Sequence, residues 1–386
     1  MSKPGVLRGT VQRYAWGSRE ALPRIMGVPP TGEPQAELWL GAHPRGPSML
    51  RRGGEDHSLD EVIADNPVAE LGAETTRSFG NELPFLLKIL AVDQPLSLQA
   101  HPTRQQAQAG FEAEDERGIP VDADNRSYRD RSHKPELICA LEPFTAFCGF
   151  RPPSTAAELL DSLKVSDLTP AVGFLVADQS DQALRWLLER PPSAGAEIAH
   201  RVVEACAMPG PYPAERQWAV RIGQQHPGDI GVATALMLNL VELSPGQALF
   251  LEAGNLHVYL HGVAVEIMAN SDNVLRGGLT PKHVDVAALL EVVDCRADQV
   301  PVMTPDSSHF TFRPPVPDFC LSRIEVEGEV RCQPDGPEIV LCTSGQVSAA
   351  GCEITGGEAV WLPAGTGEYA ISGTGLVFRA QTNHRE

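Results

Sequence analysis

The spacing of apolar residues changes twice along the chain, and this change constrains the fold more than any other feature. Up to about residue 150, short apolar runs such as ELWLGAHP and LPFLLKILAV alternate with Gly, Pro and Asp. Runs of this length between turn residues are typical of strands in a β-sandwich or barrel. From 154 to 242, apolar residues instead recur at i, i+3 and i+4, which predicts helices. Strand-like runs return at Ser244 and continue to the C-terminus.

These changes predict a mainly β protein with a helical insertion. We expect a β-roll core from residues 1–153 together with 243–318, a helical domain of about five helices at 154–242, and a second β-roll at 319–386. A chain of 386 residues exceeds one ordinary core, which agrees with two or three domains. One more helix is expected after Pro102, where a Pro-Thr start opens TRQQAQAGFEAEDERG.

Two segments resemble each other and link the two rolls. GQALFLEAGNLHVYL (246–260) and GEAVWLPAGTGEYAI (357–371) align without a gap, and both indicate a hairpin of two strands around a glycine turn. His257 of the first copy corresponds to Glu368 of the second. We therefore expect a metal-binding imidazole in the first roll and a structural role for the second.

Composition excludes several classes of function. A net charge of −19 argues against nucleic acid or an anionic membrane as partner, because either requires a basic face. No apolar run has the length of a membrane span, and the opening MSKPGVLRGT lacks the apolar core of a signal peptide. The eight cysteines show no CxxC pair, which favours reduced thiols. We expect a cytoplasmic protein and a monomer, although the absence of long heptads excludes only a coiled-coil route to oligomers.

The stretch PLSLQAHP (95–102) contains candidate metal ligands. Residues two apart in a strand project from one face, so Ser97, Gln99 and His101 are expected to point together. A half-buried strand edge would explain this pattern equally well. Two further blocks contribute candidate ligands, namely Glu136 in SYRDRSHKPELICAL and His257 in AGNLH. Two imidazoles, one carboxylate and one amide oxygen suit zinc with an open coordination position.

Long blocks in this chain resemble the type I mannose-6-phosphate isomerases, a family of cupin-type enzymes. The blocks are YAWGS, AELWLGAHPRGPS, LPFLLKILAVDQPLSLQAHP, HKPE and LEAGNLHVYLHGVAVEIMANSDNVLRGGLTPKHVDV, in order from about residue 11 to 290. The resemblance implies one zinc ion per chain, held by Gln99, His101, Glu136 and His257. It also implies a catalytic arginine at Arg276. Positions expected to line the substrate pocket are Trp16, Lys88, Ser97, Lys134, Tyr259, Glu266 and Asp272.

The implied reaction interconverts D-mannose 6-phosphate and D-fructose 6-phosphate through an enediolate. Such an aldose–ketose isomerisation needs a base near neutrality, an electrophile for the developing oxyanion and a group that holds the phosphate. Glu266 and Lys134 are both candidates for the base, and His133 is a competitor. Lys88 and Lys134 could also hold phosphate as point charges.

Other interpretations of the same residues remain open. The chain could be a non-catalytic, metal-dependent cupin that binds a sugar phosphate, or another cupin metalloenzyme with iron in the pocket. Gln99 fits an iron site poorly, because such sites favour imidazoles with a carboxylate in a facial set. The choice among zinc, cobalt and manganese, the tolerance for other aldoses, and a catabolic or biosynthetic role are left open by the sequence.

Overall fold

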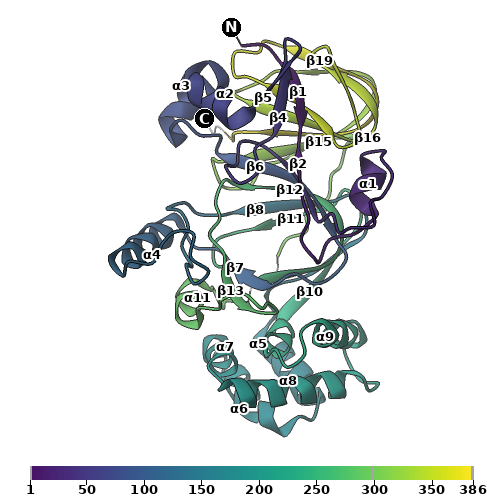
Figure 1. Ribbon diagram of the computed structural model, residues 1–386. Helices are drawn as coiled ribbons and strands as arrows, with labels where there is room; N and C mark the ends of the chain where they lie inside the picture. The colour runs from purple at the N-terminus through teal and green to yellow at the C-terminus, as the bar shows by residue number, and fades with distance from the viewer. Residues whose placement is uncertain (1, 298–299, 384–386) are drawn as a thin grey trace.

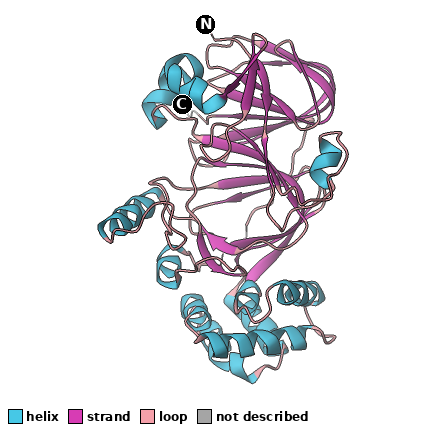
Figure 2. Ribbon diagram, viewed as in Figure 1, coloured by secondary structure: helices cyan, strands magenta, loops and turns pink. Residues whose placement is uncertain are grey.

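The computed structural model describes residues 2–297 and 300–383. Two β-rolls lie one above the other, and a cluster of helices lies below the lower roll (Figures 1 and 2). The upper roll contains the C-terminal strands, and the lower roll contains the residues around PLSLQAHP. The prediction of a mainly β protein with a helical insertion is confirmed.

The helices outside the insertion are α1 (Ala21–Ile25), α2 (Leu59–Asp65), α3 (Pro67–Phe79), α4 (Arg104–Glu116) and α11 (Val286–Val292). The strands of the lower roll are β2 (Thr10–Gln12), β3 (Glu37–Leu40), β6 (Phe85–Val92), β7 (Leu98–Ala100), β8 (Glu136–Ala140), β9 (Phe144–Phe150), β10 (Leu238–Leu243), β11 (Ala248–Leu251), β12 (His257–Ala269) and β13 (Leu275–Gly278). The strands of the upper roll are β1 (Gly5–Arg8), β4 (Met49–Arg52), β5 (Glu55–Ser58), β14 (His309–Phe312), β15 (Cys320–Cys332), β16 (Glu338–Ala349), β17 (Cys352–Thr355), β18 (Glu358–Leu362) and β19 (Tyr369–Gln381).

The lower roll is organised around β12 and β6. Strand β6 (FLLKILAV) is buried at every position and pairs with β12 on one side and β3 on the other. A continuous apolar run is what a strand needs when both of its faces are covered. The single lysine in this run, Lys88, is therefore drawn into the interior, where it needs charged partners.

The helix expected after Pro102 is confirmed as α4. Thr103 caps its N-terminus, since its hydroxyl accepts from the backbone N–H of Gln106, and the Gln106 side chain in turn accepts from the N–H of Thr103. This reciprocal pair satisfies two backbone donors that the first turn leaves free. Because Thr103 follows His101 by two residues, this cap also fixes the end of the segment that contains His101.

The insertion contains more helices than expected. It comprises α5 (Pro153–Ser162), the 3₁₀ turn η1 (Ser166–Leu168), α6 (Thr169–Val176), α7 (Ser180–Leu188), α8 (Pro192–Cys206), α9 (Pro213–Gln225) and α10 (Gly231–Ala235). The expectation that helices continue to residue 242 is wrong, because α10 ends at Ala235 and β10 then pairs with β9 in the lower roll. Pairing with a neighbouring strand outweighed the helical periodicity of this segment.

The strand pairing differs from the expected domain boundaries at both ends of the chain. Strand β1 pairs with β18 and β4, and β14 pairs with β15, so the upper roll includes strands that the sequence assigned to the core at 1–153 and 243–318. Strand β10 lies in the lower roll although all of it except Leu243 falls within 154–242. These pairings join segments far apart in sequence, which local periodicity does not encode.

The two similar segments form related units, but neither is a hairpin. Strand β8 lies between β11 and β12, and β16 lies between β18 and β19. The same registers recur, since Leu251 pairs with Glu136 in the lower roll and Leu362 pairs with Glu338 in the upper one. The rolls thus share a three-strand unit in which a third strand separates the two that the sequence suggested would pair.

Candidate metal centre and active site

Three strands of the lower roll bring the four expected ligands to one place. His257 is the first residue of β12 and pairs directly with Gln99 in the middle of β7. Glu136 opens β8, and His101 follows the end of β7. All four therefore lie at or near strand ends, where a side chain can leave the sheet and meet those of neighbouring strands.

The side chains converge on a buried point. His101 Nε2 lies 3.3 Å from Glu136 Oε1, and His257 Nε2 lies 3.5 Å from Glu136 Oε2. One ligand atom from each of the three residues falls within 4.8 Å of the others, and each residue is 1% exposed. Gln99 adjoins them, with its amide nitrogen 3.3 Å from His257 Nε2. Its carbonyl oxygen faces Ser97, so the amide must turn over before the oxygen can serve as a ligand.

Each imidazole is oriented from behind by a backbone carbonyl. His101 Nδ1 lies 2.8 Å from the carbonyl oxygen of Asn273, and His257 Nδ1 lies 3.1 Å from that of Asn255. An Nδ1–H that donates to a carbonyl leaves the Nε2 lone pair free for a metal.

Two buried atoms of the group lack a hydrogen-bond partner within residues 2–297 and 300–383, namely His101 Nε2 and Glu136 Oε2. A buried polar atom without a partner calls for an explanation, and a bound ion is one. The donor set and these atoms fit zinc.

The electrostatics of the group favour metal binding. Burial, reinforced by the positive charge of Lys134, lowers the pKa of His101 to about 4, so this imidazole is neutral near pH 7. Burial opposes ionisation of Glu136, but Lys134 and the imidazoles reverse this effect and hold the pKa of the carboxyl well below its usual value. Neutral imidazole and ionised carboxylate are the forms that bind a metal.

Lys134 and His133, two candidates for the base, have different surroundings. Lys134 is buried and its ammonium contacts Glu136, so it lies beside the metal group. His133 Nε2 instead lies 2.9 Å and 3.0 Å from the two carboxylate oxygens of Asp318, which also contacts Arg104 at 3.4 Å. The contacts of Lys134 therefore place it nearer the ligands than those of His133 do.

Glu266 and Lys88 form a second buried charged group. They are directly paired residues on β12 and β6, and Lys88 Nζ lies 3.3 Å from Glu266 Oε2 and 3.4 Å from Glu37 Oε2. Burial raises the pKa of Glu266, the charges of Glu136 and Glu37 raise it further, and Lys88 opposes the rise. Burial would lower the pKa of Lys88, but the two carboxylates raise it instead. One ammonium thus holds two carboxyl groups in the core.

Cationic side chains gather beside the ligands. Arg276 on β13 pairs with Gln99 across the ladder. Burial, with a contribution from Arg129, lowers the pKa of Arg276, and burial followed by the charges of Arg276, Arg45 and Arg129 lowers that of Lys282. In the described part of the chain, Arg129, Arg276 and Lys282 form no ion pair with a carboxylate. An excess of positive charge without acidic partners is the environment that a phosphate needs. We call these three residues the cationic group, together with Arg45, which does pair with a carboxylate, that of Asp272.

The remaining expected pocket residues lie around this site. Ser97 donates to the Gln99 amide oxygen at 3.3 Å, as expected for side chains on one face. Tyr259 is 2% exposed, its ring lies 5.5 Å from that of His257, and burial raises its pKa well above the usual value. Trp16 packs on the cluster that contains Tyr259 and stacks on Tyr14 at 5.8 Å. Asp272 contacts Arg45 and lies 3.4 Å from His43 Nε2.

Several residues of the site were not singled out from the sequence. They are Tyr14, Glu37, Trp39, His43, Arg45, Arg129, Lys282 and Asn273. Most stand inside the blocks that carry the family resemblance, such as YAWGS, AELWLGAHPRGPS and GLTPKHV. The signal was therefore present, but only the contacts show which members of each block face the site.

The upper roll contains a counterpart of the metal carboxylate. Glu338 opens β16 as Glu136 opens β8, and Arg379 pairs with Val340 as Glu266 pairs with Ile138. Arg379 Nε donates to Glu338 Oε2 at 2.8 Å, and the Tyr369 hydroxyl donates to the same oxygen at 2.7 Å. A guanidinium thus satisfies the carboxylate in this roll. This arrangement agrees with a structural role for the second copy.

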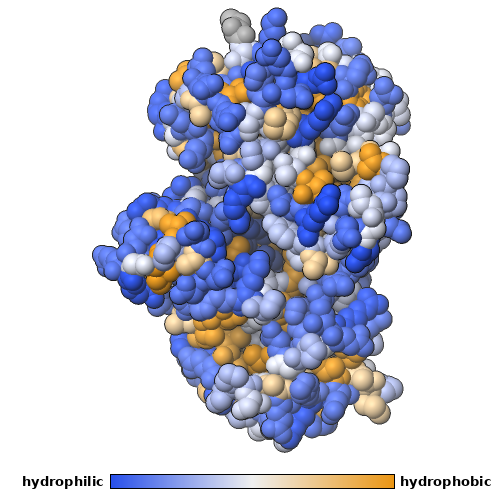
Figure 3. All heavy atoms as spheres, in the orientation of Figure 1, coloured by the Kyte–Doolittle hydropathy of each residue, from blue (hydrophilic) through white to orange (hydrophobic). Residues whose placement is uncertain are grey.

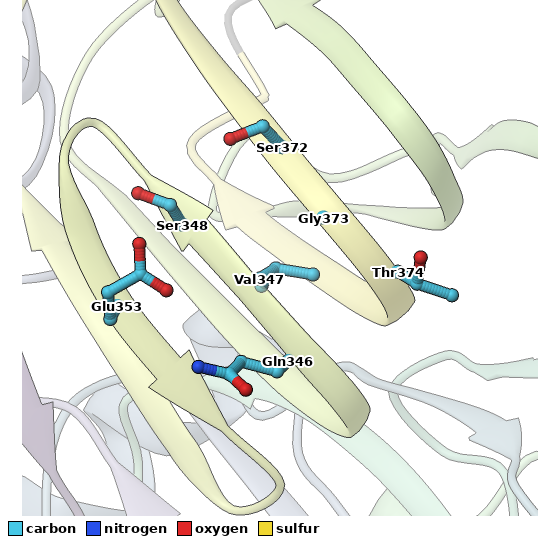
Figure 4. A pocket seen from close by; sticks show the side chains of 7 residues that line it. All are labelled: Gln346, Val347, Ser348, Glu353, Ser372, Gly373 and Thr374. Carbon is cyan, nitrogen blue, oxygen red and sulfur yellow. The ribbon is translucent and has the colours of Figure 1, made fainter.

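Among the described residues, His101, Glu136 and His257 form the only group of three or more His, Cys, Asp or Glu side chains arranged to hold a metal ion. A shallow groove of about 530 Å³ on β16 and β19 is lined mainly by small and uncharged residues, with Glu353 at its side (Figure 4). The face shown in Figure 3 is mostly hydrophilic, and its apolar patches are more extended over the lower, helical part. None of the helices in residues 2–297 and 300–383 has both the length and the apolar character needed to span a bilayer.

A β-roll that holds two histidines, a glutamate and a glutamine at its strand ends defines a cupin-type metalloprotein. The model of the family "Phosphomannose isomerase type I, catalytic domain" matches residues 6–153. The chain is 35% identical to the mannose-6-phosphate isomerase of Escherichia coli K12, over 97% of this chain and 98% of that protein. It is 33% identical to the human mannose-6-phosphate isomerase, over 91% and 90%. The chain belongs to the type I phosphomannose isomerase family.

Solved structures agree with this assignment. A mannose 6-phosphate isomerase from Salmonella typhimurium bound to substrate and zinc superposes with a TM-score of 0.90 at 35% identity, covering 99% of this chain and 100% of that chain. A zinc-bound mannose 6-phosphate isomerase gives a TM-score of 0.91 at 35% identity with the same coverage.

Proposed function

We propose that this chain interconverts D-mannose 6-phosphate and D-fructose 6-phosphate through an enediolate, with one zinc ion per chain. The observation that carries the proposal is the buried His101–Glu136–His257 group with the cationic group beside it. Relatives at 33–35% identity are named mannose-6-phosphate isomerases, and one related structure holds both substrate and zinc.

His101, Glu136, His257 and, after its amide turns over, Gln99 would hold the ion. When bound, zinc polarises the sugar oxygens and stabilises the negative charge of the enediolate. The protein supplies the dry surroundings that strengthen this effect, since the three charged or imidazole ligands are almost fully buried.

The cationic group would bind the phosphate and orient the sugar. Arg276 offers a guanidinium that is held on β13 next to Gln99 and has no acidic partner in the described residues. We assign it a catalytic role, because its charge lies next to the ligands where the oxyanion develops. Asp272 fixes Arg45 through their ion pair.

Proton transfer between C1 and C2 would fall to Glu266 or Lys134. Burial raises the pKa of Glu266 toward the working range of a base, which supports that residue. Lys134 contacts Glu136 and would lie beside a bound ion, which supports Lys134 as the other candidate. Lys88 would keep Glu266 ionised and oriented. Trp16, Ser97 and Tyr259 would line the pocket on the side of β7 and β12.

One preparation tests the proposal. Purified protein incubated with mannose 6-phosphate should produce fructose 6-phosphate, lose this activity with a strong chelator, and regain it with zinc. Binding of the sugar phosphate without any ketose product would favour the non-catalytic alternative instead. A monomeric state, a cytoplasmic location and the absence of nucleic-acid or membrane partners stay predictions from the sequence.

A further inference from the structure

Asn273 lies directly behind His101, one of the proposed zinc ligands. It is fully buried and lies between Asp272 and Arg276, two residues of the proposed site. Its backbone carbonyl is the partner of His101 Nδ1 at 2.8 Å. A ligand histidine is commonly oriented in this way, and such partners matter for metal affinity.

The side chain of Asn273 makes hydrogen bonds through both amide atoms to one loop. Its Oδ1 accepts from the backbone N–H groups of Arg129 at 2.7 Å and Asp130 at 3.2 Å. Its Nδ2 donates to the backbone carbonyls of Asp130 at 2.9 Å and Ser132 at 2.8 Å. An amide can satisfy two carbonyls and two N–H groups at once, whereas a carboxylate cannot donate.

Asp130 makes the reciprocal connection. Its carboxylate accepts from the Ser271 hydroxyl at 2.9 Å and from the backbone N–H of Asp272 at 2.7 Å. It also accepts from Asn273 Nδ2 at 3.1 Å and from the N–H of Ser132 at 2.8 Å. Two buried or half-buried side chains therefore cross between the same two segments, 129–132 and 271–273.

The two segments lead directly to the site. The first continues into Lys134 and Glu136, and the second continues into Arg276. The carbonyl that orients His101 stands on the second segment. A displacement of Asn273 would therefore move a ligand's partner, a ligand-bearing strand and the catalytic arginine together.

We propose that Asn273 is a positioning residue: its amide joins the 129–132 loop to the 271–273 segment, and its carbonyl holds His101 in the tautomer that binds zinc through Nε2. The inference rests on the proposed function for the identity of the ion. It goes beyond that function because it assigns zinc affinity to a residue that touches neither the ion nor the substrate.

Asn273→Asp is the decisive variant. It keeps the size of the side chain but places an oxygen against the carbonyls of Asp130 and Ser132. We expect zinc affinity, measured by competition with a chromophoric chelator in the absence of substrate, to fall about 10- to 100-fold. The ring nitrogen signals of His101 in ¹⁵N NMR of the zinc-loaded protein should lose the pattern of an Nδ1–H held by a carbonyl. Activity at saturating zinc should fall through kcat more than through KM.

Arg216→Met is the matched control, because Arg216 fastens backbone in the helical region without contact with the site. Its guanidinium donates to the carbonyls of Pro211 at 2.6 Å and Ala205 at 2.9 Å, and the residue is 5% exposed. This variant should lose stability yet bind zinc as the unaltered protein does.

If Asn273→Asp does not fold, Asp130→Asn replaces it. That variant weakens the reciprocal connection and should still lower zinc affinity by several-fold. Zinc affinity within twofold of the unaltered protein in a folded Asn273→Asp or Asp130→Asn would overturn the proposal. Because affinity is measured without substrate, a protein that binds zinc but forms no ketose would defeat the proposed function and leave this inference standing.

Discussion

Replacement of Lys88 by methionine should destabilise the protein in a pH-dependent manner. Lys88 Nζ lies 3.3 Å from Glu266 Oε2 and 3.4 Å from Glu37 Oε2, and its side chain is 9% exposed. At an effective dielectric constant near 20, each contact corresponds to about 5 kcal/mol of attraction. Desolvation offsets much of this, at several kcal/mol per ion.

The loss of stability on replacing Lys88 comes from the buried carboxyl groups of Glu37 and Glu266, which remain. Two carboxyl groups would be left in the core without their cation, and breaking a buried pair in this way costs about 3–5 kcal/mol. Burial already raises the pKa of Glu266, and this pKa would rise further without the opposing charge of Lys88. A carboxyl whose pKa is raised in the folded state lowers the stability of the protein as pH rises above the pKa of that group in the unfolded chain. The deficit should therefore be largest near pH 8 and shrink toward pH 5.

Urea denaturation followed by tryptophan fluorescence at pH 5 and pH 8 measures this effect. Lys164→Met is the control, because Lys164 pairs with Asp161 at 2.7 Å while 75% and 65% of the two side chains are exposed. Such a surface pair contributes about 0–1 kcal/mol. Adding Glu266→Gln to Lys88→Met should recover part of the loss at pH 8. The reasoning is refuted if Lys88→Met costs no more than Lys164→Met, or if its cost is equal at the two pH values.

Four further outcomes are expected. Glu136→Gln should abolish stoichiometric zinc binding in metal analysis while the far-UV CD spectrum stays unchanged, because it removes the anionic ligand between two imidazoles. Arg276→Lys should lower kcat about 10²- to 10³-fold at unchanged zinc content, and equal kinetics would contradict an oxyanion role. For Asp272, burial opposes ionisation, but His43 and Arg45 hold its pKa at about 2. Relative to the usual 3.8, this corresponds to at most about 2.5 kcal/mol, present above pH 4 and lost as pH falls toward 2, so Asp272→Asn should flatten acid unfolding in that window. Gly262→Ala should lower Tm in thermal melts by the equivalent of more than about 1 kcal/mol, because φ is +128° and a Cβ would lie 2.5 Å from the Pro143 carbonyl oxygen.

Part of the metal site, which consists of Gln99, His101, Glu136 and His257, could be predicted from the sequence because the periodicity of a strand is a local property. Alternation of two along PLSLQAHP is enough to place Ser97 and Gln99 on one face, and the structure shows their side chains in contact. The convergence of His101, Glu136 and His257 was a hypothesis until the pairing of β7, β8 and β12 was known. From their positions in the sequence alone, each of these three residues could equally have had a purely structural role.

The roles of Lys134 and His133 could not be separated in that way. They are neighbours in the sequence, yet one contacts Glu136 and the other contacts Asp318, which lies 185 residues away from His133. Asn273 was missed for the same reason, since an asparagine acquires meaning only from the groups around it.

By itself, the sequence determined the order of strand-rich and helical regions, the α4 helix and its cap, and the residues able to bind a metal, because these depend on periodicity and side-chain chemistry. Only the tertiary structure decided that β1, β4 and β5 complete the upper roll, that β10 is a strand, and that Asn273 stands behind His101. These features arise from hydrogen bonds and ion pairs between distant segments. Such contacts exist only after the chain has closed its loops, and no local pattern records them.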